Sequence, residues 1–329
     1  MPKAPKTETT SGVVPFDLPV ELALARPVTE VPPEAPGRWF EPKVDGWRCC
    51  LRTGRDARLF SRHGTDLSQA FSDIVAAAAG LPDAVLDGEL LAVRPDGTLA
   101  FGLLQTRAGG RGPRPREGFQ TQIAAFDLLA EGSRDLRALP LGERRAGLLA
   151  VLPAGGAIWP LPTTDSPDQA KGWFGSLGGG IEGCVVKSSA RPYRGGHRSD
   201  WLKYRVKDSV SAVILGITPA ATPASQSAVL GLPGSDGRLR AVGVSLPLPA
   251  ALRAHLATRL RPTGRGLAEL PGTVGGLPGS APVRYQPVEP TTVVDIEVDA
   301  GQQEYGRYRH RPRVLRLRAD LEANDLAPR

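Results

Sequence analysis

The sequence predicts an α+β fold in two domains, the second of which is a small β-barrel. Strand-like runs and helical stretches alternate up to about residue 207. Beyond that point short strand candidates follow one another between Gly/Pro turns, with a single helix. The chain has 329 residues, of which 41% are hydrophobic, so it is long enough to build a core in each of two domains. We expect a first domain at residues 1–207, with residues 1–14 as a flexible tail, and a second at 208–329.

In the first domain, two extended runs between residues 39 and 59 flank a tight Asp45-Gly46 turn, so Lys43 lies just ahead of a turn. Residues 71–82 have helical spacing and a Gly-Pro stop, whereas residues 85–93 predict a strand, a turn at Asp87-Gly88 and a second strand. A strand, a helix and a strand are expected at 122–129, 141–152 and 181–187.

Residues 106–118 contain no core-forming side chains, which predicts a solvated loop. The arginines in it are either simply solvated or a surface for a nucleic-acid backbone.

The second domain has five strand candidates and one helix, which fit a small closed barrel of the oligonucleotide-binding (OB) type. Periodicity alone would also permit other small β-barrels. The strands are expected at 210–216, 228–232, 239–244, 292–298 and 313–318, and the helix at 249–259.

Composition narrows the function classes. The net charge is +7 with a pI near 9.6, and the cationic excess is arginine, which suits bidentate phosphate recognition. A nucleic-acid partner fits this charge, although genome composition explains it equally well. Three cysteines provide neither a zinc nor a disulfide framework, and we expect them to be packing residues. No apolar run approaches the roughly 18 residues of a membrane span, which indicates a soluble, cytoplasmic protein. We expect it to be a monomer.

Lys43 is the candidate nucleophile in the tetrapeptide Lys43-Val44-Asp45-Gly46. A lysine at a strand end can be held in a pocket where desolvation and neighbouring cations favour its neutral, nucleophilic amine. The tetrapeptide alone is weak evidence, because any hairpin can contain it.

Further motifs follow in series: E-P-K-V-D-G-W-R at 41–48, S-R-H-G at 61–64, L-D-G-E-L at 86–90, F-D at 126–127, E-G-C-V-V-K at 182–187 and W-L-K-Y-R at 201–205. In this order they resemble the motifs of ATP-dependent DNA ligases, in the covalent nucleotidyltransferase superfamily. The likeness is in particular to the small bacterial two-domain ligase C enzymes, related to the ligase module of bacterial end-joining proteins. The resemblance covers most of the chain. It implies a nucleotidyltransferase (adenylation) domain of antiparallel sheets with helices, followed by an OB-fold barrel.

The resemblance also implies roles at the matching positions. Lys43 attacks the α-phosphorus of ATP, while Glu41 hydrogen-bonds adenine and Phe126 stacks on it. Glu89 and Glu182 help to place Mg²⁺ or Mn²⁺, which prefers a few carboxylates plus phosphate oxygens. The remaining nucleotide contacts, to ribose or phosphate, are expected from Arg48, Arg62, Glu89, Lys187, Lys203 and Arg205.

Two positions depart from the family pattern. Arg205 stands where the family often has lysine, and Leu321 ends the R-A-D-L motif where the family commonly has lysine. Since that motif orients pyrophosphate, Leu321 is expected to affect the efficiency of enzyme adenylylation. The four histidines are given no catalytic role. Nucleic-acid contacts are expected from Arg62, Arg107, Arg111, Arg309, Arg311 and Arg318.

The expected activity is the sealing of nicks with 3′-hydroxyl and 5′-phosphate ends in DNA repair. The expected partners are nicked duplex DNA and a Ku-like end-binding protein or a repair polymerase, in the bacterial nucleoid. Only about 36 residues precede the core, so we expect no dedicated amino-terminal clamping domain. The rivals are an RNA or mixed DNA/RNA ligase, a capping guanylyltransferase and a non-catalytic nucleic-acid clamp. The sequence leaves open the repair pathway and the preference between DNA and RNA ends.

Overall fold

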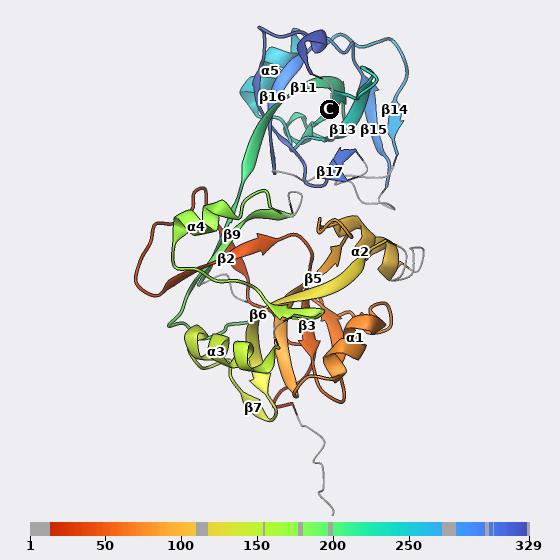
Figure 1. Ribbon diagram of the computed structural model, residues 1–329. Helices are drawn as coiled ribbons and strands as arrows, with labels where there is room; N and C mark the ends of the chain where they lie inside the picture. The colour runs from red at the N-terminus through yellow and green to blue at the C-terminus, as the bar shows by residue number, and fades with distance from the viewer. Residues whose placement is uncertain are drawn as a thin grey trace, which may run out of the picture. The chain divides into compact units, whose positions relative to one another are not determined.

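The computed structural model (Figure 1) describes residues 14–109, 118–153, 155–176, 180–196, 200–271, 281–299, 303–304 and 306–327. The chain divides into two compact units, Met1–Tyr204 and Arg205–Arg329, whereas the sequence predicts the boundary after residue 207. The expected tail lies outside the described residues except for Val14, as do Arg111 and His197.

The first unit contains two sheets. A four-stranded sheet has β1 next to β10, which is parallel to it, then β9 and the antiparallel β2. A six-stranded sheet runs from β4 through β3, β5 and β6 to β7, with β8 parallel to β6. The bounds are β1 Ala25–Pro27, β2 Arg38–Val44, β3 Trp47–Arg52, β4 Arg58–Ser61, β5 Ala84–Val93, β6 Gln120–Glu131, β7 Arg134–Asp135, β8 Ile158–Pro160, β9 Ile181–Ser188 and β10 Trp201–Arg205.

Two cores hold these layers together. In the first, helices pack against the six-stranded sheet, as Phe71 and Ile74 near α1 and Leu148 in α3 show. The second is shared by both sheets, since Ile181 and Trp201 of one sheet contact the cluster that contains Phe126 of the other. The space between the sheets is therefore walled by both. The helices are α1 Ser72–Ala79, α2 Phe101–Ala108, α3 Leu141–Val151 and α4 Pro167–Gly172.

The expected hairpin around Asp45-Gly46 is present as β2 and β3. Gly46 is required there because a Cβ atom would collide with the backbone oxygen of Leu90 and lie 2.9 Å from Glu89 Cγ. The turn that follows Lys43 is thereby pressed against β5.

Two sequence expectations are wrong in the first unit. Residues 84–93 form one continuous strand, β5, without a turn at Asp87-Gly88. A register shift between Asp87 and Gly88 absorbs the glycine instead, and a Cβ there would lie 2.9 Å from Ala124 O of β6. Residues 106–108 belong to helix α2 rather than to a loop, because Arg107 continues the buried face that Leu104 begins.

The second unit is built around one seven-stranded sheet in which the pairings are antiparallel. Its long strand β11 pairs with β16 from Lys207 to Val213 and with β12 from Val213 to Ile217, and the second pairing contains a register shift between Ile214 and Gly216. All five expected strands and the helix are present, and β14, β15, β17 and β18 are additional. The bounds are β11 Lys207–Ile217, β12 Ala228–Pro233, β13 Leu239–Val244, α5 Ala250–Ala257, β14 Ala268–Leu270, β15 Val283–Pro287, β16 Val293–Asp299, β17 Gln303–Glu304, β18 Arg307–Tyr308 and β19 Arg313–Leu317, with short 3₁₀ turns at Pro223–Ser225 and Ala323–Asp325.

Cys49, Cys50 and Cys184 are free and buried, as expected for packing residues. Burial raises the pKa of Cys50 and of Cys184 to about 12, so neither is a ready nucleophile. Among the described helices, none has the length and apolar character needed to span a membrane.

Candidate functional site

Most of the residues predicted for catalysis, nucleotide binding and metal binding converge between the two sheets of the first unit. The four-stranded sheet contributes Glu41 and Lys43 from β2 and Glu182 and Lys187 from β9. The six-stranded sheet contributes the others, which are Arg48 from β3, Glu89 from β5 and Phe126 from β6. Residues separated by up to 146 positions in sequence are thus collected into one site.

Lys43 lies next to the last residue of β2, and its ammonium forms an ion pair with Glu182 Oε1. The Lys43 side chain is 18% exposed, whereas Glu182 is fully buried. A buried carboxylate thus anchors an amine that an incoming electrophile can still reach.

Glu41 and Lys187 form a second ion pair, with 2.6 Å between Glu41 Oε2 and Lys187 Nζ. Both side chains are buried, at 2% and 1% exposure. Burial raises the pKa of Glu41, and Lys187 and Arg145 oppose that rise. Among the described residues, Glu41 Oε1 has no hydrogen-bond partner. One buried acceptor of the pair is therefore left over for a ligand.

An aromatic wall adjoins this pair. The Lys187 ammonium lies 4.5 Å from the Phe126 ring centroid and 3.9 Å from that of Trp201. The two rings meet edge to face, with 6.0 Å between centroids. This position does not fit the prediction that Lys187 reaches phosphate, because its ammonium is buried and already paired with Glu41.

Arg48 is held by a bidentate pair with Asp87, at 2.9 Å for Nε to Oδ1 and 2.6 Å for Nη2 to Oδ2. The buried Tyr193 hydroxyl donates to the same Asp87 Oδ2 at 2.6 Å and accepts from the Ala23 backbone N–H at 2.8 Å. Arg48 also lies 5.1 Å from the Phe126 ring centroid. Its guanidinium is thus fixed at the edge of the site.

Glu89, on the same strand as Asp87, is half-buried. Burial raises its pKa to about 7, although the nearby Lys43 and Arg48 oppose the shift. Glu89 and Glu182 are both close to Lys43, and carboxylates are the ligands that Mg²⁺ prefers. In the described part of the chain, no group of three or more His, Cys, Asp or Glu side chains has metal-binding geometry. The structure thus brings two carboxylates close to Lys43, without a third side chain that would complete a protein-only metal site among the described residues.

The structure divides the other predicted nucleotide contacts. Arg62 follows β4 and its side chain is exposed, while its backbone N–H donates to Arg48 O at 2.9 Å. Lys203 lies in β10 within the first unit, and Arg205 belongs to the second unit, where it pairs with Asp299 at 2.9 Å.

Arg107 was predicted to contact nucleic acid, but its side chain is buried and does not lie on the surface. Its side chain is 6% exposed and pairs with Asp73 at 2.5 Å and 3.1 Å. It also donates to Ala70 O at 2.8 Å and to Thr121 at 3.2 Å, so it joins α2 to α1. The prediction failed because an arginine in a glycine- and arginine-rich stretch looked solvated.

The three arginines predicted near the carboxyl terminus lie in the second unit and are half-buried. Arg311 donates to Ser245 O at 2.9 Å and to Ser227 Oγ at 2.7 Å. Arg318 pairs with Asp320 and with Asp295. Both help to tie the second unit together internally.

Asp87, Tyr193 and Trp201 were missed as site residues. Asp87 and Trp201 lie inside the motifs L-D-G-E-L and W-L-K-Y-R, so the motifs themselves could have pointed to them. Tyr193 carries no comparable signal, since its partner Asp87 is 106 residues away.

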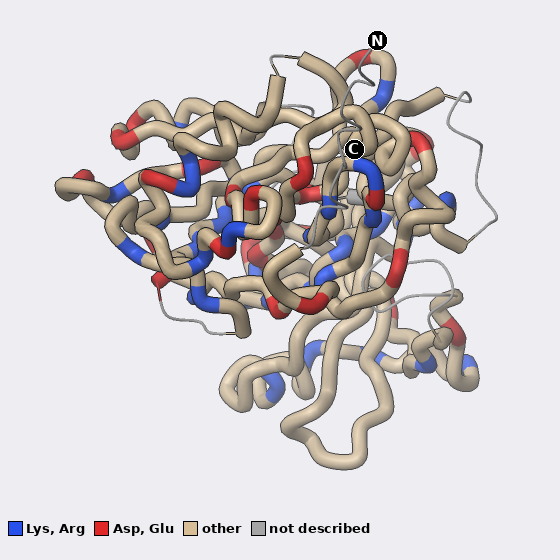
Figure 2. Tube along the Cα trace, turned by 90° about the horizontal axis from the view of Figure 1, so that it is seen from below, with Lys and Arg blue, Asp and Glu red and all other residues tan. Residues whose placement is uncertain are grey.

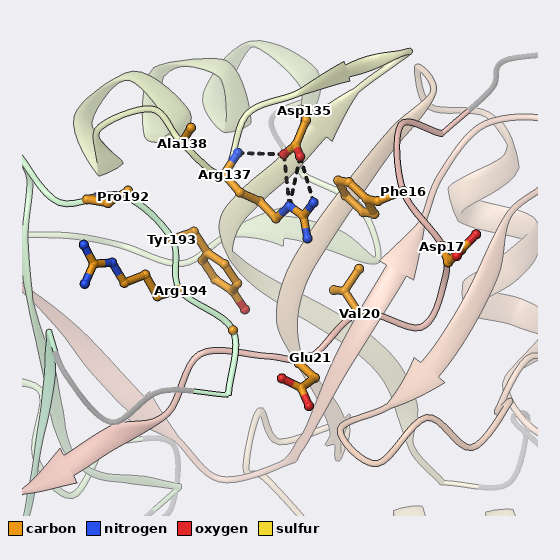
Figure 3. A pocket seen from close by; sticks show the side chains of 11 residues that line it. Phe16, Asp17, Val20, Glu21, Asp135, Arg137, Ala138, Pro192, Tyr193 and Arg194 are labelled. Atoms are coloured by element: carbon orange, nitrogen blue, oxygen red, sulfur yellow. Dashed lines mark hydrogen bonds and ion pairs between the residues drawn. The ribbon is translucent and has the colours of Figure 1, made fainter.

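Tyr193 also forms part of the wall of a cavity of about 690 Å³ (Figure 3). The segment Phe16–Glu21 lines one side, and Arg137, whose guanidinium lies 4.0 Å from the Phe16 ring centroid, lines another. Dashed lines in Figure 3 mark the Arg137 and Asp135 contacts. Lys43 and Glu182 are not among the residues that line this cavity, so it is distinct from the site of the predicted nucleophile.

Comparison with known proteins agrees with this geometry. The family model described as the ATP dependent DNA ligase domain matches residues 24–205, more than half of the chain. DNA ligase C of Mycobacterium tuberculosis is 31% identical over 335 residues, covering 92% of this chain and 91% of that protein. DNA ligase C2 of Mycolicibacterium smegmatis is 32% identical, covering 93% of this chain and 92% of that protein.

Solved structures show the same fold. The mycobacterial DNA ligase D complexed with ATP and MES has a TM-score of 0.52 and 23% identity, covering 95% of this chain and all of that one. The ligase domain of Mycobacterium tuberculosis LigD has a TM-score of 0.51 and 24% identity, covering 94% of this chain and 98% of that one. With the family model, the curated relatives and the site in agreement, this chain belongs to the ATP-dependent DNA ligase family.

Proposed function

We propose that this enzyme seals nicked duplex DNA through a covalent lysyl-AMP intermediate on Lys43. The Lys43 nitrogen attacks the α-phosphorus of ATP, an N–P bond forms, and the P–O bond to pyrophosphate breaks. AMP then passes to the 5′-phosphate of the nick, and the 3′-hydroxyl displaces it. The observation that carries the proposal is the partly exposed Lys43 amine, held by a buried glutamate between two sheets.

The residues around Lys43 fit ATP. Glu41 Oε1 is a buried acceptor without a partner among the described residues, and the exocyclic amine of adenine is a donor that would complete it. Phe126, 8% exposed, supplies an aromatic wall for the base. Glu182 is the carboxylate in contact with the proton that Lys43 loses before it attacks.

Glu89 and Glu182 would hold a divalent cation, Mg²⁺ or Mn²⁺. When bound, such a cation neutralises charge on the phosphate oxygens and on the leaving pyrophosphate. Arg48 would contact the ribose or a phosphate from its fixed position beside Asp87. Lys203 would contribute positive charge to the α-phosphate.

We further propose that the second unit is an OB-fold barrel and that both units hold DNA by its backbone. Figure 2 shows lysines and arginines interspersed with carboxylates along the chain, which suits contacts made at separate points. Arg62, exposed beside Arg48, and Arg309 remain in the proposed contact surface. Because backbone contacts release counterions, affinity for a nick should fall steeply as salt rises.

The test is sealing of a labelled nicked duplex with ATP and Mg²⁺, together with transfer of label from α-labelled ATP to the protein. Lys43→Ala should abolish both, with a loss of more than about 1,000-fold, because the nucleophile is gone. The matched control is Lys171→Ala, since Lys171 is an exposed lysine paired with Asp168 on α4, and its activity should equal wild type. Label transfer that persists in Lys43→Ala would refute the proposal.

The same assay separates the rival functions. Label from GTP in preference to ATP would indicate a capping guanylyltransferase, and sealing only of nicked RNA would indicate an RNA ligase. Binding of DNA without label transfer would indicate a clamp.

A role in repair is a separate hypothesis, motivated by the similarity to bacterial DNA ligases C and D. A Ku-like protein or a repair polymerase should raise the sealing rate, and the absence of any stimulation would count against it.

A further inference from the structure

The Lys187 side chain does not take part in the proposed chemistry, yet it is one of the most deeply buried cations of the first unit. Its ammonium contacts Glu41 Oε2 at 2.6 Å and Phe126 O at 3.5 Å, and it lies against the rings of Phe126 and Trp201. Burying such a cation costs free energy, so we expect it to have a function, which is to stabilise the charge of its anionic partner.

The anionic partner, Glu41, uses one carboxylate oxygen in this ion pair and leaves the other without a hydrogen bond in the part of the chain that the structure describes. Lys187 occupies Oε2 of Glu41, and Oε1 is buried without a partner among the described residues. An ionised carboxylate can only accept hydrogen bonds, whereas a protonated one can also donate. Adenine presents an amine donor at its 6-position, and guanine and hypoxanthine present a carbonyl acceptor there. An ionised Glu41 therefore discriminates between the two kinds of purine.

We propose that Lys187 is a specificity-determining positioning residue, which pairs with Glu41 Oε2 so that Oε1 remains an acceptor and selects adenine over 6-oxopurines. This inference rests on the proposed function, since it takes Glu41 to contact the base of the nucleotide. Lys187 acts through Glu41 and touches no reacting atom.

The charges around Glu41 support this assignment. Burial and Asp127 of β6 raise the pKa of Glu41, whereas Lys187 of β9 and Arg145 of α3 lower it. Arg145 alone cannot replace the effect of Lys187 on Glu41, because one nitrogen of its guanidinium, Nη2, already donates to the backbone oxygen of Leu161. Without Lys187 the pKa of Glu41 should therefore rise further, and the neutral carboxyl could donate to a purine carbonyl.

The experiment compares Lys187→Met with the wild type. Self-adenylylation is measured with α-labelled ATP and α-labelled inosine triphosphate across pH 6 to 9, and equilibrium binding of AMP and inosine monophosphate is measured by calorimetry. In Lys187→Met, the preference for ATP over inosine triphosphate should fall by about tenfold or more. The reason is that a protonated Glu41 can donate to the purine carbonyl, whereas an ionised Glu41 sets one acceptor against another. The pH of half-maximal labelling by ATP should move up by roughly one unit or more.

Two further variants separate specificity from folding. Lys187→Arg restores the cation and should restore the preference for ATP. Arg107→Met removes a buried cation from the Asp73 pair, which lies outside the site, and should lower stability without changing the purine preference. Circular dichroism and thermal unfolding verify that each variant is folded.

The outcomes are distinguishable. A Lys187→Met protein that labels more slowly but keeps the wild-type purine preference and pH profile would overturn the inference. If that variant does not fold, Glu41→Gln decides, because its amide can either accept or donate and should also narrow the preference. An unchanged preference in Glu41→Gln would overturn the inference. Failure of the wild type to label with ATP would instead refute the proposed function, and the inference with it.

Discussion

Two buried ion pairs in the first unit, Arg144–Asp127 and Lys187–Glu41, differ in how completely they are satisfied. Both side chains of the first pair are fully buried, and two hydrogen bonds of 2.7 Å and 2.9 Å join them. Arg144 also donates to Leu139 O and Arg191 O, and Asp127 accepts from the Leu128 N–H. The second pair has a single contact of 2.6 Å, and Glu41 Oε1 is without a partner in the described part of the chain.

The difference separates support from binding. The Arg144–Asp127 pair, whose hydrogen-bonding groups are engaged within the protein, holds α3 against β6 and has no acceptor left for a ligand. A pair with a buried acceptor to spare is poorly explained by stability, because an unsatisfied buried oxygen costs about 1–3 kcal/mol. Lys43–Glu182 is open in another sense, since its lysine remains 18% exposed. Incomplete pairs thus mark the places where substrate is expected.

The largest effect on stability is expected from breaking the complete pair. Arg144→Met should lower the free energy of unfolding by about 3–5 kcal/mol, because it leaves the Asp127 carboxylate buried and uncompensated. Urea unfolding followed by circular dichroism measures the change.

The double change Arg144→Met with Asp127→Leu is the control. It removes both charges and should recover much of the lost stability. A loss below about 1 kcal/mol in the single variant would show that the complete pair is not the support described here.

A somewhat smaller effect, on activity rather than stability, is expected at the ion pair between Lys43 and Glu182. Glu182→Gln keeps a hydrogen-bond acceptor for Lys43 but removes the negative charge. Label transfer from ATP should fall on the order of 100- to 1,000-fold, because a preorganised charge beside the proposed nucleophile is lost. Thermal unfolding should change little by comparison.

Asp168→Asn provides the matched control, since its pair with Lys171 is exposed on α4. It should label like the wild type. Near-normal labelling by Glu182→Gln would instead make the glutamate a structural partner, no different in kind from Asp127.

The fold was predictable where local pattern determines it. The hairpin around Lys43, the helix α3 and the five strands of the second unit all follow from periodicity and turn residues. The continuous strand β5 was not predictable in this way, because Asp87-Gly88 has the composition of a turn. Pairing with β3 on one side and with β6 on the other keeps these two residues extended. Tertiary pairing here overrides local preference.

The candidate site shows the same limit. Sequence motifs brought together Glu41, Lys43, Glu182 and Phe126, which the structure places around one space. Motifs do not specify which groups pair, so Lys187 was predicted to reach phosphate although it contacts Glu41. Arg107 looked solvated because its partner Asp73 lies 34 residues earlier.

The smallest effect is expected in the second unit, where ion pairs lie closer to solvent. Asp295 of β16 accepts from Ser211 Oγ of β11 at 2.7 Å and from Arg316 Nε of β19 at 2.7 Å, and so ties three strands together. Arg316 is 71% exposed, which weakens its contribution through solvent screening. Asp295→Asn should therefore lower the free energy of unfolding at pH 7 by about 1 kcal/mol.

This effect should also depend on pH. Burial tends to raise the pKa of Asp295, but hydrogen bonds from Arg316, Ser211 and Arg318 outweigh it and lower the pKa. A depressed folded-state pKa stabilises the protein above the unfolded value near 3.9, and that stabilisation disappears as pH falls through the folded value. The difference between wild type and Asp295→Asn should therefore shrink between pH 5 and pH 2. A constant difference would mean that Asp295 joins the three strands through the shape of its side chain rather than through its charge.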